Sequence, residues 1–186
     1  MSSMATPAEL PRRVLTGIVN GKSVIVSDAP VPNAHVHLAT PGLVSAVAWA
    51  TAPVPQLPHV GNEAAPPGLR VTPAPGETRL LIVTFPPDAV MADPRFDPVS
   101  AGAEYAQHLP GLAELFERAH PGMHTTESVD YDIVLDGEIW LELDDGVQTL
   151  LTAGDVAVQC GTRHAWRNKS SRPTTMVFVL IGASRR

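Results

Sequence analysis

The sequence has very little cysteine: Cys160 is the single one in 186 residues. One thiol excludes an internal disulfide framework and is typical of a reducing compartment, so we expect a cytoplasmic protein. Because Cys160 lies in a β-like stretch, we expect its side chain to be a small hydrophobic group of the core.

Long apolar runs are also missing. No stretch of about 18 consecutive apolar residues occurs, so we predict no membrane-spanning segment. The first residues, "MSSMATPAELPRR", contain neither an apolar core nor a cleavage pattern. We therefore predict no secretion signal, and we expect residues 1–13 to be a disordered N-terminus.

Basic residues are few and scattered. The chain has 13 Lys and Arg against 19 Asp and Glu, a formal net charge of −6. Binding to nucleic acid requires concentrated Lys and Arg, so this composition argues against nucleic acid as the main partner and favours a small molecule. With 44% hydrophobic residues, the chain is long enough for one domain with a sizeable core.

Proline is present but unevenly distributed: 18 of the 19 prolines lie at or before Pro121. Proline cannot donate a hydrogen bond to a sheet, so it is confined to edges, turns and loops. We therefore divide the chain into residues 14–121, with strands, loops and a short helix that contribute to a barrel, and residues 122–186, with the regular core of the sheet.

Short elements are predicted in the proline-rich part. One short helix is expected over residues 110–120, because apolar residues repeat at helical spacing after Pro110 and the dipeptide Pro121-Gly122 ends the pattern. The turn Asn20-Gly21 predicts a hairpin. The strand-like runs are "RVLTGIVNGKSVIVSD", "AHVHLAT", "LVSAVAWAT" and "TRLLIVTFPP".

After Gly122 the pattern is that of β-strands. Tyr131 and Ile133 alternate with Asp130 and Asp132, which is the period of a strand. Further strands are predicted in "EIWLEL", "VQTLL", "DVAVQ" and "TTMVFVLIG". Many short antiparallel strands with glycine turns indicate an all-β sandwich or barrel.

Two stretches carry polar residues at characteristic spacings. In "GMHTTESVDYDIVLDG" they are His124, Thr126, Asp130 and Gly137. In "GDVAVQCGTRHAWRN" they are Gly154, Gly161, His164 and Asn168. This pair of stretches resembles the two motifs of the cupin superfamily, in which His-x-His is followed by Glu and Gly, and a second motif supplies Gly-x-x-His and Asn. The resemblance implies a jelly-roll β-barrel, extended here by N-terminal strands.

The resemblance departs from the family pattern at two places. Thr126 stands where the second histidine belongs, and the proline of the second motif is absent. Two histidines and one carboxylate remain for the usual metal shell.

The spacing itself suggests a metal site. His124, Thr126 and Asp130 share parity, so on a regular strand they face one side, and His164 faces them across the sheet. Two imidazoles and a carboxylate leave positions open for water or substrate, and such a set suits Fe(II), Mn(II), Zn(II) or Ni(II). The alternative is a pocket without metal, in which His124 and His164 form hydrogen bonds.

Other residues are assigned around this group. We assign proton transfer to Asp132, which shares the inward parity, or to Glu127; a solvated carboxylate is the alternative for Asp132. If a bulge turns Glu127 inward, it is also a candidate fourth metal ligand or a partner that fixes a histidine tautomer. Candidate substrate contacts are Thr126, Trp166, Arg163 and Trp140. His35 and His37 form a His-x-His pair without the carboxylate and glycine of the motif, and we interpret them as side chains of an N-terminal strand.

Taken together, the sequence predicts a metal-dependent enzyme acting on a small organic acid or a polyketide-like molecule. The expected reaction is of the lyase type: dehydration, decarboxylation or isomerisation. An Fe(II)-dependent dioxygenase and a non-catalytic small-molecule-binding protein are the alternatives. Because cupins commonly dimerise through N-terminal strands, the resemblance also implies a homodimer.

Overall fold

The computed structural model describes residues 10–59 and 63–185. The strands are β1 (Arg12–Val19), β2 (Lys22–Pro30), β3 (His35–Val36), β4 (Val44–Thr51), β5 (Thr78–Phe85), β6 (Ser128–Asp136), β7 (Glu138–Glu142), β8 (Gln148–Thr152), β9 (Val156–Cys160), β10 (Ala165–Arg167) and β11 (Thr174–Gly182). The helical elements are α1 (Pro98–His108) and the 3-10 turns η1 (Asp88–Val90), η2 (Ala113–Leu115) and η3 (Asp144–Gly146). None of these helical elements is long and apolar enough to cross a membrane.

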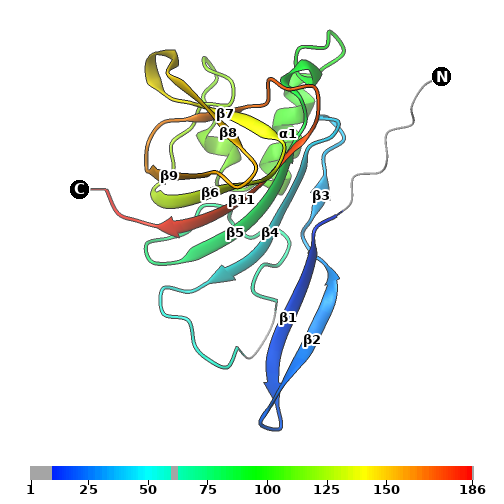
Figure 1. Ribbon diagram of the computed structural model, residues 1–186, viewed down its shortest axis with the longest axis vertical. Coiled ribbons are helices and arrows are strands. Elements are labelled where there is room, and N and C mark those ends of the chain that lie inside the picture. Colours follow the sequence, from blue (N-terminus) through cyan, green and yellow to red (C-terminus); the bar gives the residue numbers. More distant parts are fainter. Residues whose placement is uncertain (1–9, 60–62, 186) are drawn as a thin grey trace, which may run out of the picture.

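Two sheets form the body of the molecule (Figure 1). The larger sheet has the strand order β3-β4-β5-β11-β6-β9, and the smaller one has the order β10-β7-β8. The core between them combines side chains of both sheets, including Leu81, Val134, Met176 and Phe178 from the larger and Ile139 from the smaller. The predicted all-β jelly-roll barrel is therefore confirmed.

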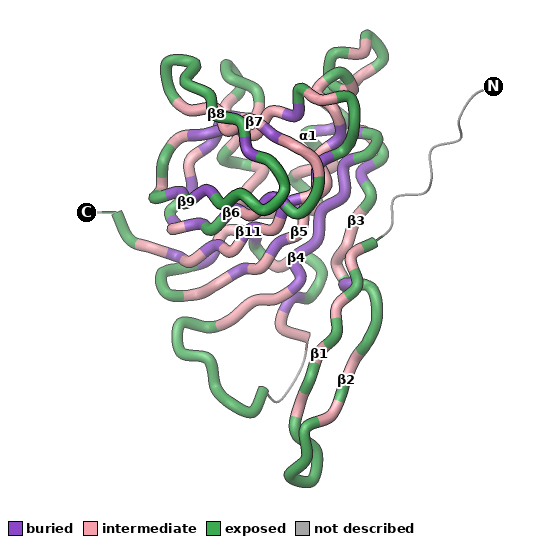
Figure 2. The backbone as a smooth tube through the Cα atoms, viewed as in Figure 1, coloured by how far each residue is buried: buried purple, intermediate pink, exposed green. Residues whose placement is uncertain are grey.

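The N-terminal hairpin lies apart from this body. β1 and β2 pair only with each other among the described strands, and they project from the barrel with most of their residues exposed (Figure 2). The predicted turn is present: Asn20 and Gly21 have φ of 49° and 74°, as a two-residue hairpin turn requires.

The boundary predicted for the disordered N-terminus is wrong at its end. Residues 1–9 lie outside the described residues, but β1 begins at Arg12. Arg12 forms a bidentate ion pair with Asp28 of β2, and Arg13 forms one with Glu63. These contacts hold the start of the strand.

The position predicted for the helix is also wrong. The α-helix lies one segment earlier, where Asp97 caps it by accepting a hydrogen bond from the Val99 amide and Pro98 occupies its first turn. Within residues 110–120 only the turn η2 is helical. Gly111 has a φ of +86°, a left-handed conformation that interrupts a helix after Pro110.

Gly137 fixes the reversal between β6 and β7. Its φ is +85°, and a Cβ there would lie 2.6 Å from Thr174 Oγ1 and 3.0 Å from the Pro173 carbonyl oxygen. A side chain at this position would therefore combine left-handed backbone strain with a clash against β11. This turn sends β6 into the larger sheet and β7 into the smaller one.

We predict that Gly137→Ala lowers the free energy of unfolding by about 3 kcal/mol, as measured by urea denaturation. The control is Gly146→Ala in η3, where φ is +72° but no heavy atom lies within 4 Å of the point that an added methyl group would occupy. That variant is expected to lose about 1 kcal/mol. Equal losses in the two variants would show that the contact with β11 contributes nothing.

Candidate functional site

His124 and His164 face each other directly. They form an isolated antiparallel bridge, in which each amide donates to the carbonyl of the other over 3.0 Å. Directly opposed residues present their side chains on one face of a sheet. The two ring centroids are 4.4 Å apart, and both residues are buried. The structure thus brings the histidines of the two motifs together.

Each imidazole is oriented by a backbone carbonyl. Nδ1 of His124 lies 3.0 Å from the Gly122 oxygen, and Nδ1 of His164 lies 2.9 Å from the Thr162 oxygen. A carbonyl oxygen only accepts, so each Nδ1 carries the proton and Nε2 keeps a lone pair. Burial lowers the pKa of His124 to about 4 and also lowers the pKa of His164. Both rings are therefore neutral near pH 7, with Nε2 available for a proton or a metal.

Two carboxyl groups of β6 lie in the same interior. Asp130 and Asp132 are both buried, and Thr126 Oγ1 donates a hydrogen bond to Asp130 Oδ2 over 3.2 Å. Burial raises the pKa of Asp130. Burial and the charge of Asp130 raise the pKa of Asp132 to about 8. Asp132 is thus a carboxylic acid at neutral pH, whereas an ordinary aspartate is ionised.

Several interior polar atoms have no partner among the described residues. They are Ser128 Oγ, Asp130 Oδ1, both carboxyl oxygens of Asp132 and Gln159 Nε2. Three of these residues lie on β6, and Gln159 lies on the neighbouring strand β9, directly opposite Asp130. Buried polar groups are normally hydrogen-bonded, so these atoms are candidates to bind a polar ligand or ordered water.

The predicted metal shell of His124, Asp130 and His164 fits in its chemistry but not in its spacing. Two free Nε2 atoms and an unpartnered Asp130 Oδ1 are suitable donors. Among the described residues, however, a different trio has its donor atoms within 4.8 Å of one another. Asp130 is instead held by Thr126. Because the three donors do not converge, metal binding at this position remains a prediction.

Two of the predicted site residues lie outside the interior. No bulge turns Glu127 inward, so its side chain is exposed, and its Oε1 lies 3.7 Å from Nε of Arg185. Glu127 is therefore not placed for proton transfer in the interior. Arg163 is occupied by ion pairs with Glu117 and Asp144, each at 2.6 Å. Its guanidinium is therefore engaged by the protein's own carboxylates rather than directed at a substrate.

The two tryptophans that were predicted to contact the substrate lie in different surroundings. Trp166 packs edge-on against His164 and Phe178, with centroid distances of 6.0 and 5.8 Å, so it borders the interior. Trp140 lies on the opposite face of β7 from the buried Ile139, and Lys169 lies 5.5 Å from its ring. The prediction for Trp140 is corrected on this ground.

The prediction for Cys160 is also wrong. The thiol is exposed at the end of β9, because the alternation that buries Gln159 turns Cys160 outward.

The trio with converging donor atoms consists of His35, His37 and Glu104. His35 lies in β3, as the strand interpretation predicted, and His37 follows two residues further on, but Glu104 comes from α1. Sequence reasoning missed the trio because the helix that carries the carboxylate was not predicted. The available signal was the helix start at Asp97-Pro98 together with Glu104 and His108 at a spacing of four.

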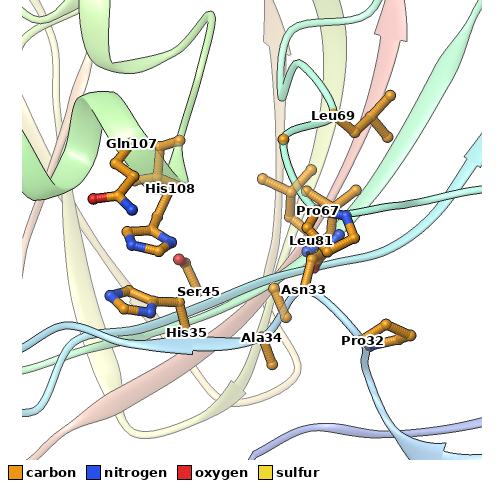
Figure 3. A pocket seen from close by; sticks show the side chains of 14 residues that line it. Pro32, Asn33, Ala34, His35, Ser45, Pro67, Leu69, Leu81, Gln107 and His108 are labelled. Carbon is orange, nitrogen blue, oxygen red and sulfur yellow. Dashed lines mark hydrogen bonds between the residues drawn. The ribbon is translucent and has the colours of Figure 1, made fainter.

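Glu104 and His37 of this trio have shifted pKa values. Burial tends to raise the pKa of Glu104, but hydrogen bonds from the amides of Leu38 and Ala39 and from His35 outweigh it and hold the pKa at about 2. Burial and the neighbouring His35 lower the pKa of His37 to about 4. A cavity of about 190 Å³ lies beside His35 and His108 rather than beside the motif histidines (Figure 3).

Comparison with known proteins gives short but clear matches to fungal proteins. The chain is 58% identical over 62 residues to the phomopsin biosynthesis cluster protein C' of Diaporthe leptostromiformis, covering 33% of each chain. It is 40% identical over 62 residues to the cupin-domain-containing oxidoreductase virC of Hypocrea virens, covering 32% of each. The match thus spans about a third of the length of these curated relatives.

A solved structure, a cupin 2 conserved barrel domain protein from Salinispora arenicola, has 18% identity and a TM-score of 0.34, with 61% of this chain and 73% of that chain covered. No family model matches the chain. The two motifs lie on paired strands of a jelly-roll barrel, and several of the similar proteins are named for the cupin domain. Over about a third of its length, the chain is therefore similar to proteins named for the cupin domain.

Proposed function

We propose that the barrel interior binds a small organic acid or a polyketide-like molecule and catalyses a lyase-type reaction on it, a dehydration, decarboxylation or isomerisation. The observation that carries the proposal is the set of unpartnered buried atoms of Asp130, Asp132 and Gln159, in a barrel that also holds two imidazoles with free Nε2 atoms. A polar ligand bound to these atoms would supply the hydrogen-bond partners that the described residues do not.

The arrangement supports transfer of a proton in both directions. The Asp132 carboxyl group can donate a proton, and Nε2 of His124 or His164 can accept one. Groups whose environments push their pKa values apart can divide the roles of acid and base. Asp130, which accepts a hydrogen bond from Thr126, is after burial the second cause of the raised pKa of Asp132. Trp166 supplies an apolar wall beside His164.

An Fe(II)-dependent dioxygenase is the second candidate. It is favoured by the names of relatives such as the cupin-domain-containing oxidoreductase virC and by the two free Nε2 atoms. A divalent transition metal (Fe, Mn, Zn or Ni) would supply a Lewis acid or a redox centre. Consumption of oxygen that depends on added Fe(II) and on the substrate distinguishes this candidate, because the lyase reaction needs no oxygen. A ligand that binds tightly without turnover would instead indicate a non-catalytic binding protein.

We predict that Asp132→Asn lowers kcat by about 100-fold or more, because it removes the proton donor without changing the side-chain shape. Turnover is to be found first by mass spectrometry of products from a panel of hydroxy acids, keto acids and aromatic polyketide-like acids. The matched control is Asp136→Asn on the same strand, where the carboxylate is exposed and pairs with Arg172. Equal activity in the Asp132 variant and the wild type would contradict the assigned role.

The pKa of Asp132 also predicts a dependence of stability on pH. Its folded value of about 8 lies above its ordinary value of 3.8, so the folded state retains this proton from about pH 4 to 8 while the unfolded chain has lost it. The stabilising contribution is thus complete below pH 4 and is lost as the pH rises toward 8. The free energy of unfolding should fall over this range relative to Asp132→Asn, by about 2 kcal/mol or more in urea titrations. Parallel pH profiles of the two chelator-treated proteins would contradict the raised pKa.

We further propose that the active form is a homodimer in which a second copy covers the outer face of the larger sheet. Two apolar rows cross four strands of this face. In register they are Ile82-Val177-Ile133-Val156 and Leu80-Val179-Tyr131-Val158. On β6 and β9 the second of these rows is open to solvent, with Tyr131 43% and Val158 58% exposed. A contiguous apolar surface of this kind is typical of an interface.

The projecting hairpin supports the same partner. Ile18 and Ile25 of β1 and β2 are 57% and 64% exposed, and a two-stranded hairpin alone is marginally stable in water. A two-fold axis would let each chain supply its hairpin and its sheet face to the other, so a second copy covers both surfaces at once.

We predict a dimer mass in light scattering after size exclusion, and a monomer mass for the double variant Val156→Lys, Val158→Lys. The two lysines would be buried against an apolar partner surface in the dimer, and the cost of burying their charges would disfavour association. The control is Val147→Lys, whose side chain is 60% exposed after η3 and away from the face. A dimer that survives the double substitution would exclude this face as the interface.

A further inference from the structure

Four chemistry-bearing side chains meet where α1 covers the edge of the larger sheet. His35 and His37, two residues apart, project to the same side of the chain at β3. Glu104 and His108, four residues apart on α1, project from one face of the helix. None of these residues belongs to the two cupin motifs.

The donor atoms of three of these residues are close together. His35 Nε2 lies 2.8 Å from Glu104 Oε1, and His37 Nδ1 lies 3.9 Å from Glu104 Oε2. All three residues can offer atoms within 4.8 Å of one another. Ligands at about 2.0–2.2 Å from a tetrahedral ion stand a little over 3 Å apart. Small rotations of the side chains therefore suffice to enclose an ion.

The ligand orientations are fixed by outer hydrogen bonds. The amides of Leu38 and Ala39 each donate to one oxygen of Glu104 over 2.8 Å. His37 Nε2 lies 2.9 Å from Ser45 Oγ, which leaves Nδ1 directed toward Glu104. That Nδ1 is buried, and it has no hydrogen-bond partner among the described residues. Metal-binding imidazoles characteristically have their other ring nitrogen held in this way.

An open side remains for a further ligand. The cavity of about 190 Å³ is lined by His35, Ser45 and His108, and Figure 3 shows the His108 ring lying over the His35 ring. These two rings are stacked, with centroids 3.4 Å apart and planes 4° apart. Of the trio only His35 lines this cavity, which is large enough for water or a small anion on the His35 side of a bound ion.

We propose that His35, His37 and Glu104 bind a divalent transition metal of the zinc or iron(II) class, with an open position facing the cavity beside His108. Two imidazoles and a carboxylate form a ligand set that these ions accept with water or substrate in the remaining position. This site is separate from the barrel interior and does not depend on the proton-transfer function proposed there.

The test uses the full chain, freed of metal with a chelator and titrated with Co(II), whose visible absorption reports coordination by nitrogen and oxygen. We expect one equivalent to bind through this site, to be displaced by Zn(II), and to be lost in His35→Gln and in Glu104→Gln. Glu104→Gln keeps the size of the side chain and one oxygen acceptor for either the Leu38 or the Ala39 amide, so it changes the local structure less than a truncation would. Ser45→Ala should weaken binding by about 10- to 100-fold, because it removes an outer hydrogen bond only.

Two controls separate this site from the motif residues. His120→Gln changes an exposed histidine and should leave Co(II) binding unchanged. The double variant His124→Ala, His164→Ala should retain the equivalent bound by the trio. Thermal unfolding of each variant checks that it is folded. Retention of Co(II) in folded His35→Gln and Glu104→Gln, or its loss only in the motif variant, would overturn the proposal, whereas the Asp132 measurements would be unaffected.

Discussion

The pairing of β6 between β11 and β9 is the constraint on which the interior depends. Asp130 lies opposite Leu180 on one side and Gln159 on the other, and Asp132 lies opposite Phe178 and Ala157. Since side chains alternate along a strand, this register turns both carboxyl groups inward and the apolar residues between them outward. A slip of one residue would exchange the two sets and place Tyr131 and Ile133 in the core.

The buried polar residues of the two motifs are of two kinds. Asn168 is fully engaged: its amide nitrogen donates to the carbonyl oxygens of Phe85 and Arg172, and its side-chain oxygen accepts from Ser170. It holds the loop after β10 in place. Asp132, by contrast, is buried without any such partner among the described residues. Buried polar groups without partners destabilise a fold, so their retention indicates a role in binding or chemistry.

The sequence predicted local features well where a single strand or turn determines them. The Asn20-Gly21 hairpin and the alternation around Asp130 follow from spacing along the chain. The meeting of His124 with His164 is not local, and it was expected only because the two stretches resemble the paired cupin motifs. The helix was misplaced because α1 has almost no apolar face: Ala101 is its one buried residue, and the Asp97 cap and the contacts of Glu104 hold it instead. Apolar spacing after Pro110 reflects packing of a loop, in which Leu112 lies against the core.

The remaining differences between the sequence predictions and the structure concern contacts between distant parts of the chain. Glu104 lies 69 residues from His35, and no pattern near either residue announces that they meet. Arg163 forms an ion pair with Glu117, 46 residues away, and no pattern near either residue predicts this contact. Parity predicts which side of a strand a residue occupies, but it does not predict which loop or helix lies on that side.

The contact between α1 and β3 also bears on how the larger sheet avoids uncontrolled growth. A sheet edge with free amides and carbonyls is a template for a foreign strand. At one edge β3 is two residues long, and the amides that follow it are taken by Glu104. At the other edge β9 pairs with β6 alone among the described strands. The two ends of the sheet are therefore unequal, and self-templated β-aggregation would start from β9, where Val156 and Val158 alternate with buried residues.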